Sequence, residues 1–89
     1  MAKNNTDLNS LPNLGKKLVE KLKMVGIETP EDLKNMGSEN AFIKLSTIDS
    51  DACLNMLYAL EGAIQGIRWY ALSESKKSEL KVFYNMTTR

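Results

Sequence analysis

The residues best suited to chemistry lie in the run LPNLGKK at positions 11–17. Its proline and asparagine predict a tight turn, and its two lysines open an amphipathic segment. The first amides of a helix have no partner within the helix, and the positive end of the helix dipole points outward there. The backbone N–H groups of Gly15 and Lys16 could therefore hold a phosphate. Lys16, Lys17 and Lys21 would add attraction that does not depend on base sequence.

Asn13 leaves two alternatives open for this helix start. Its side-chain oxygen can cap the helix by accepting the N–H of Gly15 or Lys16, and that bond would compete with a phosphate. Alternatively, Asn13 adopts a left-handed backbone conformation, which asparagine tolerates better than most residues, and the amides stay free. A capped helix with a solvated lysine face is the simpler interpretation, so phosphate contact is a hypothesis.

Few residues could support catalysis or metal binding. The chain has no histidine, the commonest general base and metal ligand, and a single cysteine, Cys53. We expect Cys53 in the apolar face of a helix, as a small core residue and not a nucleophile. The acidic pairs Glu31/Asp32 and Asp49/Asp51 stand at predicted helix starts, where carboxylates cap amides. We therefore predict no catalytic residues, no metal site, no cofactor and no enzymatic activity.

Composition and charge limit the range of partners. Twelve Lys or Arg against eleven Asp or Glu give a net charge of +1, so long-range attraction to DNA should be weak. Residues 14–25, however, carry four lysines and one glutamate, a local charge of +3. No apolar run approaches the roughly 20 residues that span a bilayer, and the first ten residues show no secretion signal. With one cysteine, we expect a cytoplasmic protein without membrane contact.

Apolar spacing and capping signals predict an all-α chain of about five helices. Their expected limits are Asn13 to Gly26, Thr29 to Gly37, Ser38 to about Thr47, residues 49–51 to about Gln65, and Ser73 onward. Thr29, Ser38 and Ser73 are the expected N-caps of the second, third and last helices. Residues 1–10 should form a tail with at most one short turn, and residues 11–89 a single helical domain.

The fourth predicted helix should organise the fold. It is apolar around most of its circumference, which indicates packing from several sides. Gly62 within it costs about 1 kcal/mol relative to alanine, so another backbone is expected to approach closely there. In the connector that follows, Trp69 is large enough to cover one end of the core.

Two apolar residues fall on otherwise polar helix faces. Met24 lies amid the lysine-rich face of the first helix, and Tyr58 in the polar arc of the fourth. Isolated exposed apolar residues are normal, and neighbouring helices can cover them. If they are exposed, they are candidates for docking a partner protein or a second copy of the chain.

Two longer stretches resemble a known family: LPNLGKKLVEKLKMVGIETPEDLKNMG, and DACLNMLYALEGAIQGIRW followed by LSESKKSELKVFY. Together, over about residues 11–84, they resemble the C-terminal domain of the TfoX/Sxy family of bacterial competence regulators. The resemblance implies a SAM-like, all-α domain related to helix-hairpin-helix domains, and a regulatory role in turning on DNA-uptake genes. It implies no catalytic residues. We expect a free-standing form of the second domain, with Asn13 where helix-hairpin-helix domains usually have glycine.

Two function hypotheses follow, and they differ in the partner. In the first, a regulatory module of competence control binds DNA weakly and nonspecifically. Its contact residues would be Asn13, Gly15, Lys16, Lys17 and Lys21. In the second, the module docks on a transcription-related protein or on itself through Met24 or Tyr58. The oligomeric state is left open.

Overall fold

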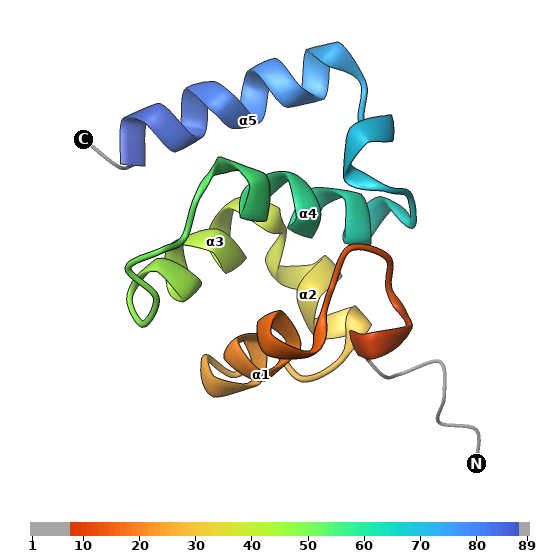
Figure 1. Cartoon of the computed structure of the whole chain (residues 1–89), viewed down its shortest axis with the longest axis vertical. Helices are drawn as coiled ribbons and strands as arrows, with labels where there is room; N and C mark the ends of the chain where they lie inside the picture. The colour runs from red at the N-terminus through yellow and green to blue at the C-terminus, as the bar shows by residue number, and fades with distance from the viewer. Residues whose placement is uncertain (1–7, 88–89) are drawn as a thin grey trace.

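The computed structural model describes residues 8–87, and all regular structure within this range is helical (Figure 1). In chain order the elements are η2 (Leu8–Ser10), α1 (Lys16–Met24), α2 (Pro30–Met36), α3 (Ser38–Ser46), α4 (Leu54–Gln65), η3 (Trp69–Ala71) and α5 (Glu74–Thr87). The predicted all-α class with five helices is confirmed. The short turn expected near the N-terminus is η2, whereas the rest of the expected tail, residues 1–7, lies outside the described residues. No helix in the described range is long and apolar enough to cross a bilayer.

The end of α1 is set by a Schellman motif at Gly26, which has a φ of +89°. The N–H of Ile27 donates to the carbonyl of Leu22 at 2.9 Å, and that of Gly26 to the carbonyl of Lys23 at 3.1 Å. These two bonds satisfy carbonyls that would otherwise lack a partner at the helix end. The glycine stop predicted from the sequence is confirmed.

The start of α2 is capped as predicted. The Thr29 hydroxyl accepts the N–H of Asp32 at 3.1 Å, and Pro30 occupies the first helical position. In turn, a carboxylate oxygen of Asp32 accepts the N–H of Glu28 at 3.1 Å. A capping box would use the N–H of the N-cap residue Thr29, one position later. Glu31 and Asp32 are therefore acids of a helix start, as expected.

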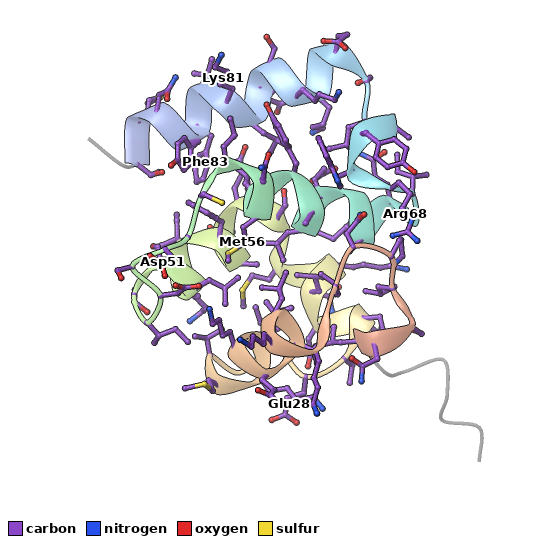
Figure 2. The ribbon with its side chains drawn as sticks, viewed as in Figure 1. Glu28, Asp51, Met56, Arg68, Lys81 and Phe83 are labelled. Carbon is purple, nitrogen blue, oxygen red and sulfur yellow. The ribbon has the colours of Figure 1, made fainter. Side chains whose placement is uncertain are left out.

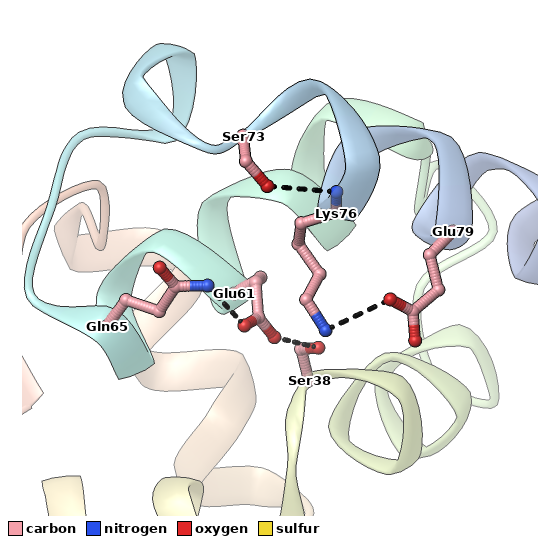
Figure 3. A network of polar contacts seen from close by, with 6 residues as sticks. All are labelled: Ser38, Glu61, Gln65, Ser73, Lys76 and Glu79. Atoms are coloured by element: carbon pink, nitrogen blue, oxygen red, sulfur yellow. Dashed lines mark hydrogen bonds and ion pairs between the residues drawn. The ribbon is translucent and has the colours of Figure 1, made fainter.

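The start of α3 differs from the prediction. Gly37, with a φ of +87°, is both the C-cap of α2 and the N-cap of α3, so Ser38 is the first helical residue and not the cap. Ser38 is buried, and its hydroxyl donates to a carboxylate oxygen of Glu61 in α4 at 2.7 Å (Figure 3). The other oxygen of Glu61 accepts the side-chain N–H of Gln65 at 2.7 Å. Ser38 thus joins α3 to α4 instead of capping its own helix.

The start of α4 is also later than predicted. Its N-cap is Cys53, whose side chain makes no capping bond and is exposed. The expectation of Cys53 in the core was therefore wrong. Asp49 and Asp51 lie in the preceding turn, where Asp49 Oδ1 accepts the N–H of Asp51 at 2.9 Å. Asp49 is therefore hydrogen-bonded within this turn and does not cap α4.

α4 lies between α5 on one side and the layer of α1 to α3 on the other (Figure 1). Packing from several sides, predicted from its apolar circumference, is confirmed. The largest fully buried side chains are Leu8, Leu22, Ile27, Leu33, Phe42, Leu45, Leu57, Leu60 and Leu80. They come from η2, from α1 to α5 and from the turn after α1, so even the turn of η2 contributes to the core.

α5 begins at the predicted cap. The Ser73 hydroxyl accepts the N–H of Lys76 at 3.1 Å, and the Lys76 ammonium lies 3.3 Å from a carboxylate oxygen of Glu79 (Figure 3). The same helix buries Leu80. α5 therefore covers α3 and α4 through one face and leaves the other to solvent.

Candidate nucleic-acid interface at the hairpin

The hairpin at residues 11–17 is held by the side chain of Asn13. Asn13 has a φ of 71°, and no other non-glycine residue in the described range has a positive φ. Its Nδ2 donates to the carbonyl of Ile67 at 2.9 Å and makes a longer contact of 3.5 Å with the carbonyl of Ala59. Its Oδ1 accepts the N–H of Trp69 at 3.1 Å. Of the two alternatives raised by the sequence, the left-handed conformation is therefore the one found.

Gly62 makes this arrangement possible. A Cβ at Gly62 would lie 2.6 Å from Asn13 Nδ2 and 2.8 Å from the carbonyl oxygen of Ile67, closer than real Cβ contacts. It would also lie 3.2 Å from the Cα of Trp69. The close backbone approach predicted from a glycine inside a helix is confirmed, and the approaching backbone is the connector that leads out of α4.

The start of α1 is left without a side-chain cap. Gly15 is the N-cap residue, with extended backbone, and within residues 8–87 no side chain accepts a hydrogen bond from the first turn. Gly15, Lys16 and Lys17 are all exposed. A Cβ at Gly15 would meet no heavy atom within 4 Å beyond its chain neighbours, so the surface around it is open. This helix start can offer both N–H donors and positive charge to an anion.

A shallow, open depression adjoins this helix start. Its lining residues are Ser10, Leu11, Pro12, Asn13, Leu14, Gly15, Gly66 and Arg68. Arg68 is exposed and belongs to the connector after α4, which reaches the hairpin from far along the chain (Figure 2). Nothing in the sequence around Arg68 connects it with the hairpin, and Gly62 is the single local sign of the close approach. The contact residues predicted from the sequence therefore did not include Arg68, which lines the depression beside Gly15.

Lys21, grouped by sequence with the hairpin lysines, has an internal partner. Its Nζ lies 2.7 Å from Oδ2 of Asp49, whose side chain is 6% exposed. The hydrogen bond from Lys21, and then that from the N–H of Asp51, lower the pKa of the Asp49 carboxyl, against the raising effect of burial. This ion pair ties α1 to the turn before α4. The charge of Lys21 is therefore largely compensated within the domain.

The two residues predicted to mark a protein surface lie in different environments. Met24 is 73% exposed. Tyr58 is half-buried, its ring stacks on Trp69 with centroids 6.3 Å apart, and its hydroxyl donates to the carbonyl of Lys77 at 3.5 Å. Tyr58 therefore belongs to the packing between α4, η3 and α5, and the open polar face on which the sequence placed it is covered. Trp69 stacks on Tyr58 but is 39% exposed and is not among the side chains packed against the core, so the expectation that it covers one end of the core was wrong.

Within residues 8–87 no three acidic, cysteine or histidine side chains gather as a metal cluster.

The fold and the hairpin geometry agree with a family match that extends over nearly the whole chain. Residues 4–84 match the model of the TfoX C-terminal domain. The protein belongs to the TfoX C-terminal domain family. The match starts before residue 11 and includes η2, in agreement with the complete burial of Leu8.

Two crystal structures from Listeria monocytogenes are similar to this TfoX C-terminal domain. A triclinic form of an uncharacterized protein is 51% identical, covers 91% of this chain and 92% of its own, and has a TM-score of 0.89. A tetragonal form of a protein of unknown function is also 51% identical, covers 91% of this chain and 99% of its own, and has a TM-score of 0.88. No curated protein matches the chain. These structures support the fold and leave the partner open.

Proposed function

We propose that this domain acts in competence-related regulation by binding nucleic-acid phosphates at the start of α1. Membership of the TfoX C-terminal domain family supports the regulatory part of this proposal. The observation that carries the phosphate part is the conformation of Asn13. Its side chain is bonded to the connector after α4, and no side chain in the described part of the chain caps the first turn of α1.

The binding chemistry would be that of backbone donors assisted by cations. The free amides of the first turn and the helix dipole favour an anion at Gly15 and Lys16. Lys16 and Lys17 are exposed beside these amides, and Arg68 lines the depression next to them. Such contacts go to the sugar-phosphate backbone, so they position a nucleic acid without selecting its sequence. With a net charge of only +1, binding should be weak at physiological salt.

The salt dependence of binding tests the proposal quantitatively. Phosphate contacts from Lys16, Lys17 and Arg68 would give a log-log slope of about −2.7 on duplex DNA. The association constant should then fall roughly 40-fold between about 50 mM and about 200 mM salt. Fluorescence anisotropy with a labelled duplex measures this slope. No binding even at the lower salt concentration would remove the phosphate proposal.

A pair of charge-reversal variants separates a local site from general charge attraction. Lys16→Glu with Lys17→Glu should abolish binding while leaving the helical signal and the melting temperature almost unchanged. The matched control is Lys44→Glu with Lys81→Glu, which makes the same change in net charge at two exposed positions on α3 and α5. Equal loss of binding in both variants would show that net charge, and not the start of α1, determines binding.

A protein partner is the second candidate, and the 73% exposure of Met24 at the end of α1 favours it. In this case Met24→Gln should weaken self-association or partner capture and leave any nucleic-acid binding unchanged. Light scattering over a range of protein concentrations tests self-association, and a pull-down from cell extract tests capture. A strict monomer that retains no partner would argue against this candidate.

A further inference from the structure

An exposed aromatic pair lies at η3, in a part of the chain that the phosphate site does not use. Trp69 is 39% exposed and Tyr70 is 64% exposed. Their rings meet edge to face, with centroids 5.7 Å apart and an interplanar angle of 79°. On the inner side, Tyr58 stacks almost parallel to Trp69, at an angle of 6°. Tyr58 thus packs against the inner side of Trp69, while both Trp69 and Tyr70 keep part of their rings exposed to solvent.

This aromatic pair is joined directly to the hairpin. The N–H of Trp69 donates to Oδ1 of Asn13, the residue that fixes the hairpin. Arg68, the residue before Trp69, lines the same depression as Gly15. Figures 1 and 2 show the connector with Arg68, followed by η3, along the edge of the molecule where the hairpin meets the end of α4. Cations and aromatic rings therefore occupy neighbouring positions on one edge.

We propose that this edge binds single-stranded nucleic acid, with a base stacked on the Trp69–Tyr70 pair and phosphates held at Arg68 and the start of α1. The proposal rests on the proposed function and specifies its ligand. Surfaces that bind single strands without sequence preference combine a cationic track for the backbone with aromatic side chains for the bases. Base stacking adds affinity for any base, because every base has a π face.

The neighbouring charges decide between a nucleic acid and a protein as the ligand of this edge. Arg68 directly precedes the aromatic pair in the chain, and Lys16 and Lys17 are exposed at the hairpin to which Trp69 is bonded. Glu74, the acid nearest to the pair along the chain, is paired with Lys77 at 4.0 Å, so the edge keeps a cationic excess that complements a polyanion. A duplex can meet the cations but keeps its base faces stacked inside the helix. A single strand can meet both the cations and the rings, which is why we infer the single strand.

Intrinsic fluorescence and anisotropy together test the inference. Trp69 is the chain's only tryptophan, so fluorescence quenching reports on this edge alone. The probes are an oligothymidylate of about 15 nucleotides, which fills one typical single-strand site, and a duplex of the same length. We expect tighter binding of the single strand, quenching of Trp69, and a loss of about fivefold or more in single-strand affinity for Tyr70→Ala. Tyr70→Phe, which keeps the ring, should restore that affinity.

The matched control is Met86→Ala, which shortens a 70% exposed apolar side chain near the opposite end of α5. Met86→Ala should change neither the affinity for the single strand nor the affinity for the duplex. All variants should keep the wild-type melting temperature. Equal binding of single strand and duplex, with no effect of Tyr70→Ala, would overturn the inference and leave the phosphate site in place. Loss of self-association in Tyr70→Ala without any change in DNA binding would also overturn it, in favour of a protein surface. Absence of binding to either probe would overturn both proposals.

Discussion

The side-chain amide of Asn13 lies so close over Gly62 that no methyl group fits between them. A Cβ on Gly62 would be 2.6 Å from Asn13 Nδ2, and 2.8 Å from the Ile67 carbonyl to which that nitrogen donates. The hairpin, the middle of α4 and the connector to η3 therefore meet at one point. Any side chain added at Gly62 must displace the group that fixes the start of α1.

This contact predicts that Gly62→Ala destabilises the domain, although alanine is the better helix former. Helix propensity alone would favour alanine by about 1 kcal/mol. Overpacking against backbone atoms costs about 1–3 kcal/mol, and displacement of Asn13 adds the loss of its hydrogen bonds. We expect a net loss of about 1–2 kcal/mol in the free energy of unfolding, measured by urea denaturation.

Ser78→Ala is the control for the propensity effect, because Ser78 is exposed on α5. This substitution should leave stability unchanged or raise it slightly. A Gly62→Ala variant that is more stable than the wild type would show that the hairpin relaxes without cost, and that the close approach has no energetic importance.

A second prediction separates the two roles of Asn13, its backbone conformation and its side-chain bonds. Asn13→Ala loses both, because alanine is unfavourable at a φ of 71° and cannot bond to Ile67 or Trp69. Asn13→Gly loses only the side-chain bonds, since glycine adopts positive φ readily. We expect both variants to be less stable than the wild type, with the alanine variant about 1 kcal/mol less stable than the glycine variant.

Urea denaturation of the two variants beside the wild type measures this difference. Equal stability of the alanine and glycine variants would mean that the hairpin changes conformation when the side chain is lost. Wild-type stability in Asn13→Gly would show that the bonds to the connector contribute nothing.

The helix limits that the sequence predicted well depend on bonds between near neighbours. The Schellman motif at Gly26 and the cap at Thr29 each need only residues within one turn, so their signals are contiguous in the chain. The same holds for Ser73 at the start of α5. Local capping chemistry is therefore enough to place most of the helices.

The features that sequence missed depend on partners far along the chain. Asp49 has the residue type of a helix cap, but it is bonded to Lys21 and within its own turn, so α4 starts later. Ser38 also has the residue type of a cap, but it donates to Glu61 of another helix. Arg68 reaches the hairpin only because Gly62 lets the connector pass close to it. None of these pairings leaves a periodic or contiguous pattern in the sequence.

The ion pair between Lys21 and Asp49 predicts how stability changes with pH. The pKa of Asp49 is lowered in the folded protein, so folding favours its ionised form. The resulting stabilisation is fully present above the ordinary pKa of an aspartate, about 3.9, and is lost as the pH falls through the lowered folded value. We expect Asp49→Asn to be less stable than the wild type at pH 7, with a difference that shrinks in acid as Asp49 becomes protonated.

Asp49→Asn is a suitable variant because an asparagine oxygen can still accept the N–H of Asp51, so the turn keeps its bond, while the charge and the hydrogen bond from Lys21 are lost together. Urea midpoints of the two proteins, compared between neutral pH and about pH 3, give the pH-dependent part. Lys21→Met removes the other partner and should reduce the same acid dependence. A stability difference that stays constant down to pH 3 would mean that Asp49 stabilises the turn through its shape and hydrogen bonds, and that its charge contributes little.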